Sequence, residues 1–458
     1  MTIIAVVLFI TISFFWAYRK YLAKSLNLID LLLAIQIVAQ FVIVEHDIGP
    51  VSLRIYNIAV LFFLFIVNVS VKKLNIFANK ITKALFLIGV LTLGWMYVTS
   101  VIRGEWTNAL LYNFLSYHVY AILWFLVLQY FARTREKVIF LSSLLVIIAA
   151  VNACAALAQW AGIDSAWALF EALVPDSQMR NEDLLVFEKR SFGYTPGLQS
   201  YSVPLSYLML FGLIVWSYLL VGFKKTLTLK KSFTILLLLI FQAGIVVSLS
   251  RSSFVVFNFL VVVSFFWFSK RFLTNRTSKG GLIGAILILG FLYVLLIELP
   301  NMSYESIKGY DTSRLFVFSN SGRISLWMIG ISLAFRHPLL GPGNERFVTE
   351  LGELTAPHNL FVNSLVSYGV PGFIFTVLLL WQVVKLCKHS LRKAIMFNPI
   401  SAHSIGLVLV LIGYILKGMF HNDSFSTGGI IGWLLIGLIS GDCCSTESNS
   451  TRNDTRYS

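Results

Sequence analysis

Long apolar segments, separated by short polar ones, follow one another along almost the whole chain. Most are roughly 17 to 25 residues long, which lets a helix cross a hydrocarbon core about 30 Å thick. Backbone groups in lipid must be hydrogen-bonded within their own segment, so these segments are expected to be helical. The pattern predicts thirteen spans, the first and last of them short, near residues 2–17, 28–44, 53–71, 84–102, 109–132, 138–162, 201–222, 232–249, 253–269, 282–299, 360–384, 404–420 and 428–441.

Composition and charge agree with a membrane protein. The chain has 458 residues, of which 57% are hydrophobic and 12% charged, and its formal net charge is +15. Lysine and arginine cluster in alternate loops, which therefore face the cytoplasm, while the other loops hold most of the acidic residues and face outward. The positive charge thus reflects membrane topology, and nucleic-acid binding is not expected.

The predicted fold class is all-α, a polytopic membrane helical bundle of about 12–13 transmembrane helices. Residues 1–441 are expected to form a single transmembrane domain, and the polar tail, residues 442–458, a disordered cytoplasmic extension. Two predicted outer loops are long, residues 163–200 and 300–359. Loops of this length commonly carry lids or binding sites, so an active centre is expected on the outer side.

The second long loop contains a short helical pattern. Ser321 is a candidate cap, and Ile324, Trp327, Ile331 and Phe335 recur at helical spacing. Pro338 is expected to end the helix. The segment is short for a span and is bracketed by arginines, which favours a helix lying at the outer membrane surface.

Two arginines are candidates for binding an anion. Arg323 is expected in the first turn of the short helix, where free amides and the helix dipole favour phosphate; the alternative is a surface ion pair. Arg251, in "VVSLSRSSFVVF", is expected in a short outer turn among serines that offer hydroxyl groups. The alternative for Arg251 is an arginine that only reaches toward lipid headgroups.

One histidine stands at the start of an outer-facing helix. In "APHNLFVNSLVSYGVPG", His358 precedes the run that begins the next span, where a neutral imidazole can accept a proton from a hydroxyl. A structural role is the alternative. Arg190 lies in the turn-rich segment "FEKRSFGYTPGLQSYSVP" and is either a binding residue or part of a solvated loop. The histidines, cysteines and acidic residues show no metal-ligand spacing, so metal catalysis is not expected.

These motifs resemble the signature region of the O-antigen ligase and polymerase superfamily of bacterial inner-membrane proteins. The resemblance covers residues 190–372 and the general topology. "SLSRSSF" and "KRSFGYTPG" are similar to the family's arginine-containing segments. The remaining motif positions, in the family's order, are Arg323, Trp327, Pro338–Gly343, His358 with Asn359, and Gly369 with Gly372.

The resemblance implies a GT-C-like fold and a metal-independent, cofactor-free glycosyltransferase in the bacterial inner membrane, with its active site on the outer face. The donor would be an oligosaccharide on undecaprenyl diphosphate, and the acceptor a glycan or lipid A core. Arg251 and Arg323 would bind the diphosphate, with Arg190 and Asn359 as further candidates for substrate contact. His358 would deprotonate the acceptor hydroxyl, and direct attack would invert the anomeric carbon.

Ligase and polymerase both remain open. The stretch between Arg323 and His358 has 34 intervening residues, shorter than in many ligases of the superfamily. A transporter, such as a glycolipid flippase or a small-anion permease, is the alternative class of function. It predicts a path of ionisable groups across the bilayer, whereas the predicted spans hold Lys417 deep inside and Glu298 near an edge.

Overall fold

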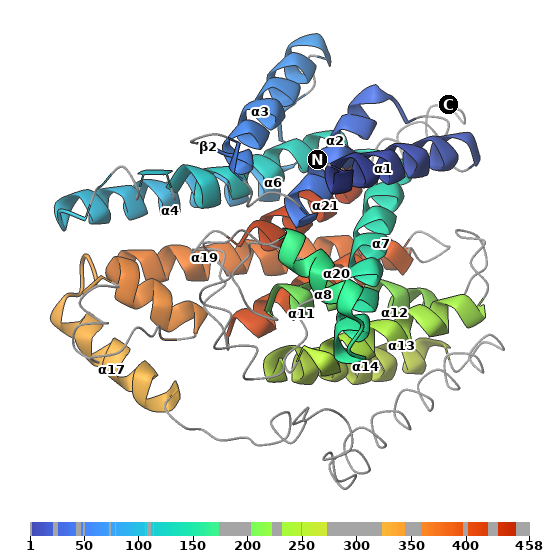
Figure 1. Cartoon of the computed structure of the whole chain (residues 1–458). Helices are drawn as coiled ribbons and strands as arrows, with labels where there is room; N and C mark the ends of the chain where they lie inside the picture. Colours follow the sequence, from blue (N-terminus) through green and yellow to red (C-terminus); the bar gives the residue numbers. More distant parts are fainter. Residues whose placement is uncertain are drawn as a thin grey trace, which may run out of the picture. The chain divides into compact units, whose positions relative to one another are not determined.

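The computed structural model confirms an all-α polytopic architecture, with one two-residue strand pair (Figure 1). Within the described part of the chain, four helices are long and apolar enough to cross a membrane: Lys80–Ile102, Phe114–Phe131, Arg135–Trp160 and Leu360–Ala394. Shorter apolar helices accompany them. The structure describes residues 2–21, 26–42, 47–48, 51–72, 75–77, 79–105, 107, 111–112, 114–173, 203–221, 231–248, 250–272, 323–343, 357, 359–396, 402–419 and 429–445.

The chain divides into two compact units, each assembled from segments that are distant in sequence. The first comprises residues 1–53, 139–318 and 394–413, and the second residues 54–138, 319–393 and 414–458. The helices α7 (Arg135–Trp160) and α20 (Ala402–Gly418) contribute to both.

In the first unit, three helices pack through small and aromatic residues: α12 (Gly212–Val221), α13 (Lys231–Val247) and α14 (Arg251–Phe272). A methyl group at Gly212 would lie 2.9 Å from Phe241 Cβ, so the absent side chain allows α12 and α13 to approach closely. The Trp216 indole donates a hydrogen bond to Ser264 Oγ at 2.6 Å. The unit also contains α1 (Thr2–Tyr21), α2 (Leu28–Val42), β1 (Asp47–Ile48), β2 (Val51–Ser52), α8 (Asp164–Leu173) and α11 (Val203–Met209).

In the second unit, α6 (Tyr120–Phe131) packs along α21 (Ile430–Ser445). Gly437 and Gly441 bring α21 against the backbone of α6 and of the residue after it, since added methyl groups would lie 3.0 Å or less from Phe125 O and Ala132 C. Small residues at such contacts are typical of membrane helices. The unit also contains α3 (Leu53–Lys72), α4 (Lys80–Ile102), the π-helix η1 (Phe114–Val119), α17 (Arg323–Arg336) and α19 (Leu360–Met396).

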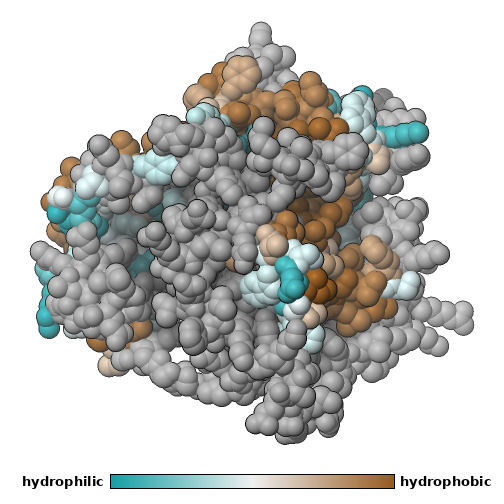
Figure 2. All heavy atoms as spheres, viewed as in Figure 1, coloured by the Kyte–Doolittle hydropathy of each residue, from teal (hydrophilic) through white to brown (hydrophobic). Residues whose placement is uncertain are grey.

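Large apolar side chains lie on the surface of both units, and Figure 2 shows such apolar areas in brown. Phe63 on α3 is 65% exposed and Phe266 on α14 is 66% exposed. Surfaces of this kind are rare on soluble monomers but suit contact with lipid tails. They support the assignment of the chain as a membrane protein.

Twelve of the thirteen predicted spans coincide with helices, and residues 282–299 lie outside the described residues. The span expected over 201–222 is divided into α11 and α12. At the division the N–H groups of Leu213 and Ile214 donate to carbonyls three residues back instead of four, which tightens the turn. The helix predicted over 360–384 continues to Met396, because no helix-breaking residue follows Gly372 in this stretch. The predicted single transmembrane domain and cytoplasmic tail stay predictions.

Candidate active site

Both arginines predicted to bind the diphosphate are the first residue of a helix. Arg251 begins α14 instead of lying in the preceding turn, and Arg323 begins α17. The Ser250 carbonyl accepts the first helical hydrogen bond of α14, from Phe254 N at 3.0 Å. N–H groups of a helix's first turn lack intrahelical partners and form the positive end of the dipole. The first-turn position expected for Arg323 is confirmed, and anion binding at both positions stays a prediction.

The serines near Arg251 have a different role from the one expected. Ser248 Oγ donates to Ile245 O at 2.7 Å, and Ser250 Oγ lies 3.2 Å from Ser253 Oγ. All three serines are buried. A hydroxyl has one proton, so Ser248 cannot donate to an anion while it makes this bond. These serines hold the α13–α14 connection in shape, and the prediction that they jointly offer hydroxyls to an anion is wrong for Ser248.

The backbone on both sides of position 358 is fixed by hydrogen bonds. Before it, Pro357 O accepts from the Trp327 indole at 2.6 Å. After it, Asn359 Oδ1 accepts from Phe361 N at 3.0 Å and Val362 N at 3.2 Å, which makes Asn359 the N-cap of α19. Its Nδ2 donates to Met419 O at 2.9 Å. These bonds give Asn359 a structural role at the start of α19.

His358 and Arg190 lie outside the described residues, and so do the side chains of Arg251 and Arg323. The convergence of these groups at one pocket therefore stays a prediction. Within the second unit, however, the segments that carry Arg323 and His358 are joined. Trp327 is four residues after Arg323, on the same helix face and about 6 Å further along the axis. Its indole donates to the carbonyl of Pro357, which is the residue before His358.

Packing of α17 against the first part of α19 reinforces this junction. Leu333 of α17 forms a buried cluster with Val362 and Val366 of α19, and Leu326 and Trp327 pack against it. The predicted helix and its end before Pro338 are confirmed. Its packed side differs from the predicted stripe, because Phe335 is 75% exposed. A helix that is apolar nearly all round cannot reveal from sequence which side packs on protein and which faces lipid.

The turn after α17 fits into a kink of α19. The kink is at Gly369, whose φ of 68° favours glycine, and the turn contains Gly341 with φ 71°. Gly343 N donates to Val366 O at 3.1 Å, and Val370 N donates to Pro338 O at 2.7 Å. The signature glycines predicted from sequence thus meet one another in the structure.

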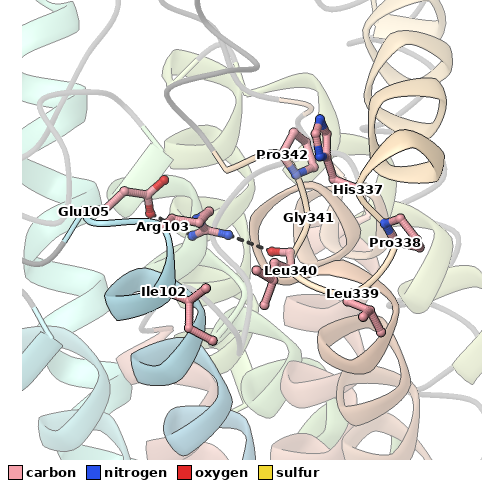
Figure 3. Close-up of a pocket in the computed structure, with 9 residues that line it drawn as sticks. All are labelled: Ile102, Arg103, Glu105, His337, Pro338, Leu339, Leu340, Gly341 and Pro342. Atoms are coloured by element: carbon pink, nitrogen blue, oxygen red, sulfur yellow. Dashed lines mark hydrogen bonds and ion pairs between the residues drawn. The ribbon is translucent and has the colours of Figure 1, made fainter.

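Proline explains why the kink needs partners from elsewhere. Pro371 has no N–H, so the carbonyl of Ser367, four residues earlier, has no helical donor. Arg103 Nη1 supplies one at 2.7 Å, and the same nitrogen donates to Leu340 O at 2.7 Å (Figure 3). Arg103 Nη2 forms an ion pair with Glu105 Oε2 at 2.8 Å. Arg103 therefore joins the end of α4 to both the turn and the kink.

A second donor from α4 completes the contact. The Trp95 indole donates to Tyr368 O at 2.8 Å. Sequence reasoning missed Trp95 and Arg103 and treated Glu105 only as an outer-loop acid. Two signals were available in the sequence. Arg103 and Glu105 directly follow an apolar span, and a distant helix contains Pro371. Sequence alone does not pair these segments.

A cavity of about 530 Å³ lies beside this contact (Figure 3). Arg103, Glu105 and His337 contribute polar groups, and Ile102 and residues 338–342 contribute the remaining wall. No group of three or more histidine, cysteine, aspartate or glutamate residues suited to a metal occurs among the residues that were described.

The region that contains most of these motifs is similar to a known protein family. Residues 233–377 match the family model described as O-antigen ligase. The match confirms the resemblance to the O-antigen ligase and polymerase superfamily. Within the matched range are Arg251, Arg323, His358 and Asn359, whereas Arg190 and Arg103 precede it. The superfamily supports a glycosyltransferase-type activity of the ligase or polymerase kind. No curated protein matches the chain.

Proposed function

We propose that the protein transfers a saccharide from undecaprenyl diphosphate to a hydroxyl group of a second glycan or of lipid A core. The reaction takes place at the outer face of the bacterial inner membrane. The observation that carries the proposal is the bond from Trp327 to Pro357, which joins the helix that begins with Arg323 to the residue before His358. This bond supports the proposal because it holds the helix that begins with Arg323 against the backbone next to His358.

His358 acts as the general base in this proposal. It takes the proton from the acceptor hydroxyl, whose oxygen attacks the anomeric carbon of the donor sugar. The bond from that carbon to the diphosphate oxygen breaks, and its electron pair leaves with undecaprenyl diphosphate. A single displacement inverts the anomeric configuration and needs no enzyme-bound sugar. The protonated imidazole then returns its proton to water.

Arg251 and Arg323 stabilise the leaving diphosphate. Guanidinium groups make paired hydrogen bonds to phosphate oxygens, and the free amides of a helix N-terminus add further donors. Charge that develops on a leaving group is stabilised most by donors already in position. In this proposal two guanidinium groups take the role that a metal ion has at other diphosphate sites, so the reaction is metal-independent and cofactor-free. Arg190 serves as an additional diphosphate contact, and Asn359 acts by fixing the backbone beside His358.

The test is surface-glycan assembly in a strain that carries single substitutions. His358→Ala, Arg323→Ala and Arg251→Ala each abolish assembly on a glycan gel, while membrane levels of the protein stay normal. Normal glycan in a variant contradicts the role proposed for that residue. Normal glycan in His358→Ala also contradicts the proposed general-base mechanism. Activity of the purified enzyme in excess chelator tests metal independence, and a deletion strain separates ligase from polymerase. Loss of all polymer indicates a ligase, whereas one repeat unit left on the core indicates a polymerase.

A further inference from the structure

The cavity beside Arg103 lies entirely within the second unit, and the proposed transfer chemistry does not use it. Its volume of about 530 Å³ is in the range of small-molecule sites, roughly 300–1,000 Å³. The wall is partly apolar and partly polar, with Arg103 and Glu105 on one side and His337 on the side of the turn (Figure 3). Sites of this composition bind a ligand through a small number of oriented hydrogen bonds.

The Arg103–Glu105 pair does not favour an anion. Arg103 Nη1 donates to two backbone carbonyls at 2.7 Å, and Nη2 is paired with Glu105 at 2.8 Å. The guanidinium charge is therefore compensated by a carboxylate, and its terminal nitrogens are engaged. A diphosphate needs uncompensated cationic donors, and a phosphate beside Glu105 would meet a like charge. The ligand that fits is electrically neutral.

Glu105 offers hydrogen-bond acceptors to such a ligand. A carboxylate has about four lone-pair sites, and the ion pair with Arg103 uses one. The side chain of Glu105 is 21% exposed. Gly343 lets the carboxylate lie close to the backbone, because a methyl group there would lie 2.6 Å from Glu105 Oε1. Acceptors of this kind bind hydroxyl groups, while Pro338 and Leu339 present carbon surfaces. Hydroxyls together with C–H faces describe a sugar ring.

The location excludes the reacting sugar itself. The cavity lies at the C-terminal end of α17, and Arg323 is at its first residue. The helix has 14 residues, so the two ends are about 21 Å apart. A ligand in the cavity is therefore several sugars away from an anomeric carbon held at Arg323.

We propose that the cavity binds a neutral monosaccharide or disaccharide unit of the glycan substrate, at a distance from the reacting end. The identity of the ligand as this glycan rests on the proposed function. The site would distinguish a glycan of several sugars from a single sugar on its lipid carrier. Arg103 and Glu105, on one side of the cavity, precede the residues 233–377 that the family model matches.

Substitutions that fill the cavity test the proposal. Ile102 and Leu339 line it and are 61% and 69% exposed, so Ile102→Trp and Leu339→Trp add bulk without disturbing the buried contact. Met328→Trp is the matched control, because Met328 is 67% exposed on α17 and does not line the cavity. The probe is oligosaccharide released by mild acid from the host's own surface glycan, without lipid or diphosphate. Saturation-transfer NMR with the purified full chain in detergent measures its binding.

We expect binding by the wild-type chain and by Met328→Trp, and at least a tenfold weaker affinity in the two filled variants. His358→Ala should bind the oligosaccharide like the wild type. Absence of binding to the wild type, or unchanged affinity in the filled variants, overturns the site. Normal glycan transfer by His358→Ala would instead overturn the proposed function and leave the binding result unaffected.

Steady-state kinetics identify which glycan occupies the cavity. In the filled variants, kcat is unchanged and KM rises at least tenfold for one substrate. That substrate, donor or acceptor, is the one whose glycan occupies the cavity. A donor that carries one sugar on undecaprenyl diphosphate shows no change in KM as donor. An equal effect on this short donor contradicts a site remote from the reacting end.

Discussion

The bond between the Trp327 indole and Pro357 O fixes the backbone one residue before His358. Trp327→Phe removes the donor and keeps most of the apolar ring that packs with Leu333. Loss of one neutral hydrogen bond at 2.6 Å reduces the free energy of unfolding by about 1 kcal/mol. We expect a larger effect on catalysis, because a shift of about 1 Å in a reacting group lowers the rate about 10²-fold.

The assay uses the purified chain in lipid nanodiscs with its lipid-linked donor and glycan acceptor. We expect kcat to fall between tenfold and a hundredfold, roughly 1.4 to 2.7 kcal/mol in activation free energy, with KM for the donor nearly unchanged. Trp381→Phe is the control, since Trp381 lies on α19 and is 57% exposed. The reasoning is refuted if Trp327→Phe keeps wild-type kcat while its melting temperature falls.

Three further substitutions test the contacts around the kink and the cap, each by thermal unfolding of the purified chain. Gly369→Ala should lower stability by several kcal/mol, since φ is 68° and the new methyl group would collide with Leu339 O, whereas Gly94→Ala on α4 has open space and should be neutral or slightly stabilising. Arg103→Met leaves two carbonyls without their donor and should cost about 2–6 kcal/mol, so an unchanged melting temperature would contradict the clamp. Asn359→Ala removes the N-cap of α19 and the bond to Met419 O and should cost about 2 kcal/mol, and Asn359→Asp should recover only the cap's share, because a carboxylate cannot donate to Met419 O.

The sequence predicted the spans well because lipid imposes a simple requirement. A helix needs a continuous apolar segment, and apart from α19, which continues past its predicted end to Met396, the described helices follow such segments closely. Where the prediction differed, the cause was local. The division between α11 and α12 depends on hydrogen bonds that tighten one turn, and hydropathy carries no signal for such a change.

The glycines and prolines of the signature region were visible in the sequence, but their role was not. Pro371 leaves Ser367 O without a helical donor, and Arg103 supplies the hydrogen bond from 264 positions away in the sequence. A single sequence gives no means to pair residues across that distance. The same holds for Trp327, whose spacing indicated a helical position and whose bond to Pro357 required the structure.

The face of α17 was unpredictable for a different reason. In water, the apolar side of a helix identifies its packed side, but in lipid both sides can be apolar. Leu333 packs against α19, while Met328 on the same helix is exposed, and hydropathy does not separate them. Polar residues are more informative in this setting, and the first-turn position of Arg323 was predicted from its neighbours alone.

The central prediction is that Arg251, which belongs to the first unit, shares one site with Arg323 and His358, which belong to the second. Cysteine cross-linking in intact membranes tests it most directly, after Cys154, Cys387, Cys443 and Cys444 are replaced by serine. A short bifunctional maleimide added from outside should join Arg251→Cys to His358→Cys and Arg323→Cys to His358→Cys within one chain, and donor lipid should protect both pairs. A link for the Arg323 pair but none for the Arg251 pair would contradict the account.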